Sequence, residues 1–289
     1  MKIRIFFYIA LTIISFASCV EELPLQSLDE DMKLFVVCEM TVGDDIIADI
    51  TFTGNTNGSL PAPLMRPDTF SFSLSEGEKD FGVPFNYDTA LQKFYIKREQ
   101  MQLITSEKYK FRGIGTNKNF TEPTIFIPEA LTVDTIMIKD IKLSIVNGKY
   151  ITQLECKIKI NKPSSDQSYF HFIPVNENKE VFQVTSFVKD QSAFKRLKHR
   201  PGFLVDYSRI TGDEMTFNLE ISNEKASTLI DFSLYNTTKS FYEFNYYMSN
   251  NTGTITNESP PIAGFNIKSE KAYGTFSARS KTESIVKFK

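Results

Sequence analysis

The chain has 289 residues, with 33 lysines and arginines against 35 aspartates and glutamates, and 41% of its residues are hydrophobic. A near-neutral, slightly acidic chain has no basic footprint for nucleic acid, and its apolar content is enough to bury a globular core. It contains 26 Phe, 12 Tyr and no Trp, and its Thr, Ile and Val are plentiful, a mixture that favours strands over helices.

Residues 1–18 have the pattern of a bacterial signal peptide. Two of the first four residues are basic, an uncharged apolar run extends to Phe16, and two small residues stand directly before Cys19. The run of about sixteen residues is too short to span a bilayer, which needs about twenty. Small residues before a cysteine form a lipobox, although Phe16 stands where Leu, Val or Ile is usual. We predict a lipid-anchored protein with Cys19 as its lipidated first residue.

Residues 19–31 are expected to be the lipidated cysteine and a tether. Glu21 and Glu22 stand directly behind Cys19, where Bacteroidota lipoproteins carry an acidic signal for export to the outer face of the outer membrane. A short polar linker explains two glutamates equally well. We expect an outer-membrane, lipid-anchored protein that faces the cell exterior, and the periplasmic face stays open as the alternative.

Residues 32–130 alternate apolar and polar side chains in short runs. These runs are separated by turns rich in Gly, Asn and Pro, which predicts a first β-sandwich. The runs read LFVVCEMTV, DIIADITFTG, TFSFSLSEG, KFYIKR, QLITSEKYKFRGIG and PTIFIP.

Residues 131–289 continue the strand pattern and predict a second β-sandwich. Asn147 and Gly148 form the preferred dipeptide of a tight type I′ turn, so the flanking runs should pair as a hairpin. Residues 237–248 place aromatic side chains at helical spacing and predict one short helix. Residues 192–199 are expected to form a short helix or a basic loop. The predicted fold class is all-β, with two consecutive immunoglobulin-like or transthyretin-like sandwiches and one short helix.

Two cysteines follow Cys19 in the chain, Cys38 and Cys156, each inside an apolar strand-like run. A disulfide is compatible with an exported protein. We favour two buried free thiols, because the two residues fall in different predicted sandwiches.

No motif in the chain points to catalysis, a metal or a cofactor. His171 alternates with phenylalanines in a predicted strand, where we expect a surface or edge residue, and His199 belongs to a basic cluster at 195–200. A solvated segment explains that cluster best, and contact with lipopolysaccharide phosphates or an acidic partner is the alternative. The aromatic run at 241–247 is expected to pack in the core, with a partner-binding face as the alternative. We therefore predict no catalytic residue, no metal ligand and no cofactor.

Two threonines stand in the Asp-Thr-apolar pattern of Bacteroidota O-glycosylation. They are Thr89, which follows Asp88, and Thr135, which follows Asp134. Because three-residue motifs arise readily by chance, this prediction rests on the pattern alone.

The C-terminal third resembles the closing region of a Bacteroidota outer-membrane lipoprotein family catalogued as domain of unknown function 4249. The stretch SFYEFNYYMSNN leads through two prolines into GFNIKSEKAYGTFSARS. Asn266 with Ile267, and the run from Gly274 to Phe276, fit that family, whereas residues 270–272 depart from its glycine-bearing turn. The lipidated cysteine, the LFVV strand and the Y-x-F-x-x-x-G segment from Tyr109 agree as well.

This resemblance implies a lipoprotein that works beside a TonB-dependent receptor, and it carries over no catalytic residue. The preferred prediction is therefore a non-enzymatic accessory or binding protein of a TonB-dependent transporter, acting by docking or ligand capture. Its predicted partners are the outer membrane and a TonB-dependent β-barrel receptor, with no nucleic acid. A structural or adhesive surface lipoprotein is the alternative, and a β-sandwich hydrolase is the third, disfavoured class.

Overall fold

The computed structural model describes residues 33–52, 70–79, 81–115, 118–161, 169–176, 178–187, 192–223, 230–250, 265–270 and 272–282. Strands dominate this part of the chain, and they form three sheets with one α-helix and one 3₁₀ turn among the described residues. The all-β prediction is confirmed. The folded unit begins at Lys33, so Cys19, Glu21 and Glu22 lie outside the described residues.

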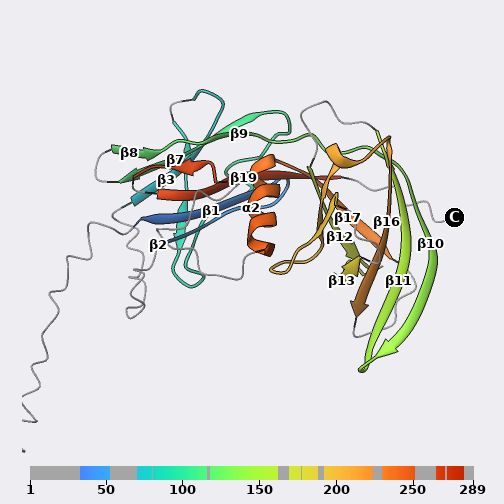
Figure 1. The fold of residues 1–289 in the computed structure, drawn as a ribbon. Coiled ribbons are helices and arrows are strands. Elements are labelled where there is room, and N and C mark those ends of the chain that lie inside the picture. Colours follow the sequence, from blue (N-terminus) through green and yellow to red (C-terminus); the bar gives the residue numbers. More distant parts are fainter. Residues whose placement is uncertain are drawn as a thin grey trace, which may run out of the picture. The chain divides into compact units, whose positions relative to one another are not determined.

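A ten-stranded sheet runs through the folded unit (Figure 1). Its strands come from both halves of the chain and follow the order β14-β15-β12-β17-β19-β1-β2-β6-β5, with β18 paired to β19. The bounds are β1 (Leu34–Thr41), β2 (Ile46–Phe52), β5 (Asn86–Asp88), β6 (Lys93–Ile96), β12 (Tyr169–Val175), β14 (Phe194–Arg196), β15 (Phe203–Asp206), β17 (Asp231–Thr237), β18 (Ile267–Lys268) and β19 (Ala272–Thr282).

Two smaller sheets complete the sandwiches. The five-stranded sheet contains β3 (Phe70–Glu76), β4 (Val83–Pro84), β7 (Lys108–Gly115), β8 (Lys118–Thr121) and β9 (Thr124–Phe126). The four-stranded sheet has the order β10-β11-β16-β13, with bounds β10 (Val133–Val146), β11 (Lys149–Ile160), β16 (Glu214–Asn223) and β13 (Gln183–Phe187).

Each smaller sheet encloses its own apolar core against the ten-stranded sheet. The first core joins Val36 of β1 to Phe72, Phe111 and Phe276, and the second joins Phe172 of β12 to other buried side chains of its half. Successive side chains of a strand point to opposite faces, so Phe276, which belongs to the first core, and Thr282 lie on the same face of β19. Leu234, which belongs to the second core, pairs with Thr282 and therefore points to that face as well. Both cores therefore lie on the same face of the ten-stranded sheet.

The C-terminal strand β19 does not stay within the predicted second sandwich. It pairs in parallel with β1, from Leu34 opposite Ala272 to Thr41 opposite Arg279, and on its other side it pairs with β17. Strand β19 therefore contributes to both halves, an arrangement that differs from the predicted separate sandwiches at 32–130 and 131–289. Parallel pairing of two segments more than two hundred residues apart leaves no local signal in either strand.

The predicted hairpin at 147–148 is confirmed. Residue pairs run from Val133 opposite Ile160 to Val146 opposite Lys149, and the connecting Asn147 and Gly148 have φ angles of 50° and 76°. Positive φ at both central residues defines the type I′ turn, whose twist matches that of the flanking strands.

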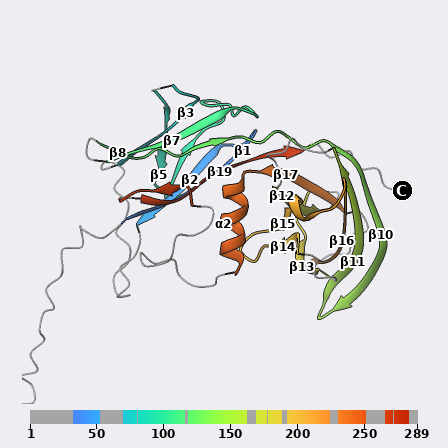
Figure 2. The ribbon, with the colours of Figure 1, turned by 45° about the horizontal axis from the view of Figure 1, so that its top comes forward.

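The predicted short helix is confirmed as α2 (Lys239–Asn250), two residues later than expected. Thr238 caps it: its Oγ1 accepts a hydrogen bond from the N–H of Phe241 at 3.3 Å, and its own N–H donates to Ala278 O at 2.9 Å. The second bond fixes the start of the helix to β19. Figure 2 shows α2 beside β19 and β12, where it covers the sheet face that points away from the cores.

Two other expectations are decided by the structure. Cys38 and Cys156 are buried free thiols, one in each core, so the disulfide alternative is wrong. Residues 192–199 form neither a helix nor a simple loop: the segment contains the short strand β14, which pairs with β15. The segment pairs with a strand at the edge of the sheet and does not form the helix that was one of the two predictions.

Candidate functional site

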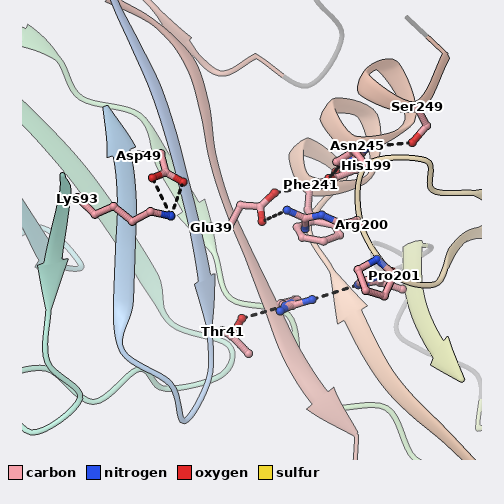
Figure 3. A network of polar contacts seen from close by, with 12 residues as sticks. Glu39, Thr41, Asp49, Lys93, His199, Arg200, Pro201, Phe241, Asn245 and Ser249 are labelled. Atoms are coloured by element: carbon pink, nitrogen blue, oxygen red, sulfur yellow. Dashed lines mark hydrogen bonds and ion pairs between the residues drawn. The ribbon is translucent and has the colours of Figure 1, made fainter. Parts of the chain in front are cut away.

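A polar network lies between helix α2 and the ten-stranded sheet (Figure 3). Its side chains come from β1, β12, β19 and α2, and from residues 197–202, which link β14 to β15. The N–H of Leu197 donates to Gly202 O at 3.1 Å and closes that segment, here called the 197–202 loop. The network thus gathers residues from both halves of the chain. The sequence did not predict that these residues lie together.

His199 joins the 197–202 loop to the helix. Asn245 Nδ2 donates to Phe241 O at 2.8 Å and to Glu39 Oε1 at 3.1 Å, so its Oδ1 faces His199 Nε2 at 2.8 Å and accepts that proton. The Nδ1 of His199 then accepts from the hydroxyl of Ser249 at 3.2 Å. Burial lowers the pKa of His199, against the raising effect of the Asn245 bond, and the neutral imidazole suits both contacts.

Ser249, His199 and Asn245 are residue types that can form a nucleophile, a base and an orienting group. Their geometry does not suit hydrolysis. Ser249 is fully buried, so no substrate carbonyl can reach its hydroxyl. It also lies in the last turn of α2, where free carbonyls, not oxyanion-binding N–H groups, are exposed. This trio is better explained as the fastening of a loop to a helix.

An ion pair continues the network toward the first strand. Arg200 Nη2 donates to Glu39 Oε2 at 2.7 Å, with side chains 25% and 18% exposed. The guanidinium carbon of Arg200 also lies 5.3 Å from the ring centre of Phe241, within cation–π range. Glu39 therefore uses one oxygen for Arg200 and the other for Asn245, which ties β1 to the loop and the helix together.

A second branch runs through Arg279 and His171. Arg279 Nε donates to Thr41 Oγ1 at 2.9 Å, and its Nη1 donates to His171 Nδ1 at 3.1 Å. The carbonyl of Pro201 lies 3.0 Å from His171 Nε2 and can only accept, so Nε2 carries the proton and the imidazole is neutral. Burial, together with the charge of Arg279, lowers the pKa of His171 to about 3, in agreement with this tautomer.

The expectation that His171 lies at the surface or an edge is wrong. The residue is 1% exposed, because β12 lies between β15 and β17 and helix α2 covers that face of the sheet. A histidine between two phenylalanines is compatible with either location. Only the position of the strand within the sheet decides between them.

The basic cluster at 195–200 is not the freely solvated segment that its charge suggested. Arg200 is in the ion pair with Glu39, Arg196 donates to Thr185 O, and the ammonium of Lys195 lies 5.3 Å from the ring centre of Tyr246 on α2. Lys198 remains exposed. The cationic side chains of the cluster therefore contact neighbouring residues, except for Lys198, which is exposed to solvent.

A groove of about 450 Å³ lies beside the 197–202 loop and is here called the basic groove. Its walls are two chain segments, Val181–Val184 and Arg196–Gly202, and neither contains an acidic residue. Arg196 and Lys198 supply cationic groups, and Gln183 supplies an amide from the opposite wall. The groove can therefore offer several hydrogen-bond donors to a bound anion.

The predicted glycosylation residues lie in different settings. Thr89 is exposed in the turn after β5, where Asp88 Oδ1 accepts from the N–H of Ala90 at 2.8 Å. Thr135 is half-buried in β10, the outer strand of the four-stranded sheet. Neither takes part in the network, and their modification stays a prediction, as do the lipidation of Cys19 and the export signal.

The aromatic run on α2 divides between core and surface. Phe241, Tyr242 and Phe244 are buried, whereas Tyr246 is 42% exposed. Phe244 packs with Phe265 at a ring-centre distance of 5.9 Å. Packing of the run is confirmed, although it lies against the helix-facing side of the sheet and not in either sandwich core.

Within the described ranges, no group of three or more His, Cys, Asp or Glu side chains could hold a metal ion. Over those same ranges, no helix is both long and apolar enough to cross a membrane.

Comparison with known proteins adds no assignment to this geometry. No protein-family model matches the chain, and a search of curated proteins found no match. The resemblance to the lipoprotein family therefore stays a prediction.

Proposed function

We propose that the protein is a lipid-anchored accessory or binding protein of an outer-membrane TonB-dependent transporter system, acting by docking or ligand capture. The observation that carries this proposal is the signal-peptide pattern that ends on Cys19 behind two small residues. Two or more acyl chains give stable membrane attachment, so a lipidated cysteine would hold the folded unit stably at the membrane.

The length of the tether supports a role beside another membrane protein. Thirteen residues separate Cys19 from Lys33, the first residue of the folded unit. A fully extended chain reaches at most about 3.5 Å per residue, so the anchor allows the unit to reach about 50 Å from the lipid. Confining both partners to one membrane raises their effective concentration, so a modest interface would be sufficient.

The burial of Ser249 and the hydrogen bonding of His199 support a non-enzymatic role. In this proposal the polar network holds the loop, the helix and the sheet together, and binding takes place at exposed surfaces. The basic groove is a concave surface that suits the capture of a polar ligand.

A pull-down from native membranes in mild detergent tests the proposal. The lipoprotein should bring a TonB-dependent β-barrel protein with it. Recovery of the lipoprotein alone would refute the accessory role. Loss of surface attachment on gene deletion, with nutrient uptake unchanged, would instead identify the adhesive alternative.

The anchor has a separate test in the Cys19→Ala variant. It should leave the membrane fraction or accumulate as an uncleaved precursor, because neither lipid attachment nor cleavage can occur without the thiol. A mature variant that still partitions into the detergent phase would show that Cys19 is not the anchor.

A further inference from the structure

We propose that the basic groove binds a phosphate group carried by a small polar ligand. The inference rests on the proposed function for its biological role, since it names the ligand class that capture would involve. Its physical basis is independent of the membrane anchor and lies in the walls of the groove itself.

The side chains of residues 195–198 contact two different parts of the protein. Lys195 lies over Tyr246, and Leu197 packs with Phe241 on the helix side. Arg196 and Lys198 belong to the wall of the groove that runs from Arg196 to Gly202. Two cationic side chains of one wall therefore lie at one concave surface.

Among the described residues, Arg200 is the one cation of the groove that pairs with a carboxylate, Glu39. Glu180, next to the Val181–Val184 wall, accepts from Asn176 Nδ2 at 2.7 Å, and Glu220 accepts from the hydroxyl of Thr185 at 2.8 Å. No described carboxylate forms a salt bridge with Arg196 or Lys198. Arg196 donates one N–H to Thr185 O, so most of its N–H groups remain available to a ligand.

The polar network holds the backbone of the cationic wall in place. Pro201 O accepts from His171, and the N–H of Lys198 donates to the hydroxyl of Ser249 at 3.4 Å. Leu197 and Gly202 close the loop at their backbones. A binding wall that is already ordered loses less conformational entropy when the ligand arrives, so these contacts assist binding without touching the ligand.

Phosphate is the anion that this donor set fits best. Arginine presents a planar fork of N–H groups and lysine a compact charge, and both are common phosphate ligands. Gln183 adds an amide from the other wall, so donors approach from two directions. A tetrahedral anion can accept from both directions, whereas a planar carboxylate directs its lone pairs into one plane.

Isothermal titration calorimetry of the full lipoprotein in neutral detergent tests the inference. The probes are inorganic phosphate, glucose 6-phosphate and glycerophosphoglycerol, which is the soluble headgroup of an anionic phospholipid. Glucose and glucuronate serve as uncharged and carboxylate controls. Tighter binding of glucose 6-phosphate would indicate a soluble phosphomonoester, and tighter binding of glycerophosphoglycerol a lipid headgroup; either supports the proposal.

Variants identify the binding wall. Lys198→Gln changes an exposed side chain and should weaken binding about tenfold, because one charge-assisted contact is lost. Arg196→Gln should also weaken binding. Lys195→Gln is the matched control: it removes an equal charge three positions away, at a side chain that contacts Tyr246 of the helix, and should leave the affinity within about twofold. Added salt should weaken binding to the unaltered protein.

Absence of binding by every phosphate probe would overturn the inference, and so would equal binding of glucuronate and glucose 6-phosphate. An equal loss in Lys195→Gln and Lys198→Gln would show general charge attraction and no groove. None of these results depends on whether a β-barrel protein is recovered by pull-down, so failure of the ligand class and failure of the accessory role are distinguishable.

Discussion

Replacing Gly274 by alanine should separate the two strands that join the halves of the protein. Gly274 pairs with Val36 across the parallel β1–β19 contact, and its φ is +145°. A Cβ at this position would lie 1.8 Å from the carbonyl oxygen of Val36 and 2.7 Å from its carbonyl carbon. Both atoms belong to the backbone of β1, so no rotation of a side chain can relieve the contact.

Two physical terms set the size of this effect. A non-glycine residue at such a φ costs about 1–3 kcal/mol, and forcing additional volume into a packed interior costs about 1–3 kcal/mol more. We therefore expect Gly274→Ala to lower the free energy of unfolding by about 2–6 kcal/mol. In a domain of this size each kcal/mol lowers the melting temperature by about 2–4 °C, so the shift should be roughly 10 °C.

Gly43→Ala is the matched control. Gly43 also has a positive φ, +91°, but nothing lies within 4 Å of the position of its Cβ. This variant isolates backbone strain, and the difference between the two variants measures the clash with β1. Urea unfolding followed by circular dichroism gives both values. Equal losses in the two variants would refute the reasoning that close approach of β1 and β19 requires glycine.

Three further predictions concern the network and the thiols. A double-mutant cycle of Glu39→Gln and Arg200→Gln, measured by urea unfolding, should give a coupling of about 1–2 kcal/mol, because both side chains are largely buried; a coupling near zero would contradict this. The pKa of His171 is about 3 in the folded protein and near 6.5 in the unfolded protein. As the pH falls below about 6.5, the imidazole is therefore protonated in the unfolded state while it stays neutral in the folded state. The free energy of unfolding should therefore decrease as the pH is lowered from about 6.5 to 3, by up to about 1.4 kcal/mol per pH unit. Unfolding measured at several pH values should show a smaller slope for His171→Gln. An unchanged slope would exclude this residue as the cause. Burial raises the thiol pKa of Cys38 and of Cys156, so maleimide labelling should proceed only on unfolding, and rapid labelling of the native protein would show that the cores are accessible.

The parts of the fold that could be predicted from the sequence are those with local causes. Asn147 and Gly148 specify their turn through the φ angles that they tolerate, and the alternation around them specifies two strands. Helix α2 follows from aromatic spacing and the Thr238 cap. Each of these signals involves residues within a few positions of one another, so no knowledge of the rest of the fold was needed.

The site could not be predicted because its contacts join distant segments. Glu39 and Arg200 are 161 positions apart in the chain, and Glu39 and Asn245 are 206 apart. Nothing around Glu39 distinguishes it from a solvent-facing residue of an alternating strand. The basic cluster at 195–200 was visible as a charge feature, but the placement of Lys195 against the helix and of Lys198 at the groove depends on which sheet edge the segment joins.

The network also specifies how β1 and β19 align. Glu39 and Thr41 project to the helix side of β1, and Thr41 lies opposite Arg279, which donates to it. A slip of one residue within β1 would turn both polar side chains into the first core and bring Met40 out to the helix side. An unpaired carboxylate in an apolar core costs several kcal/mol, so the polar residues enforce the register that the apolar ones permit. Because Glu39 also holds Arg200, the same register determines where the 197–202 loop lies and hence where Lys198 meets the groove.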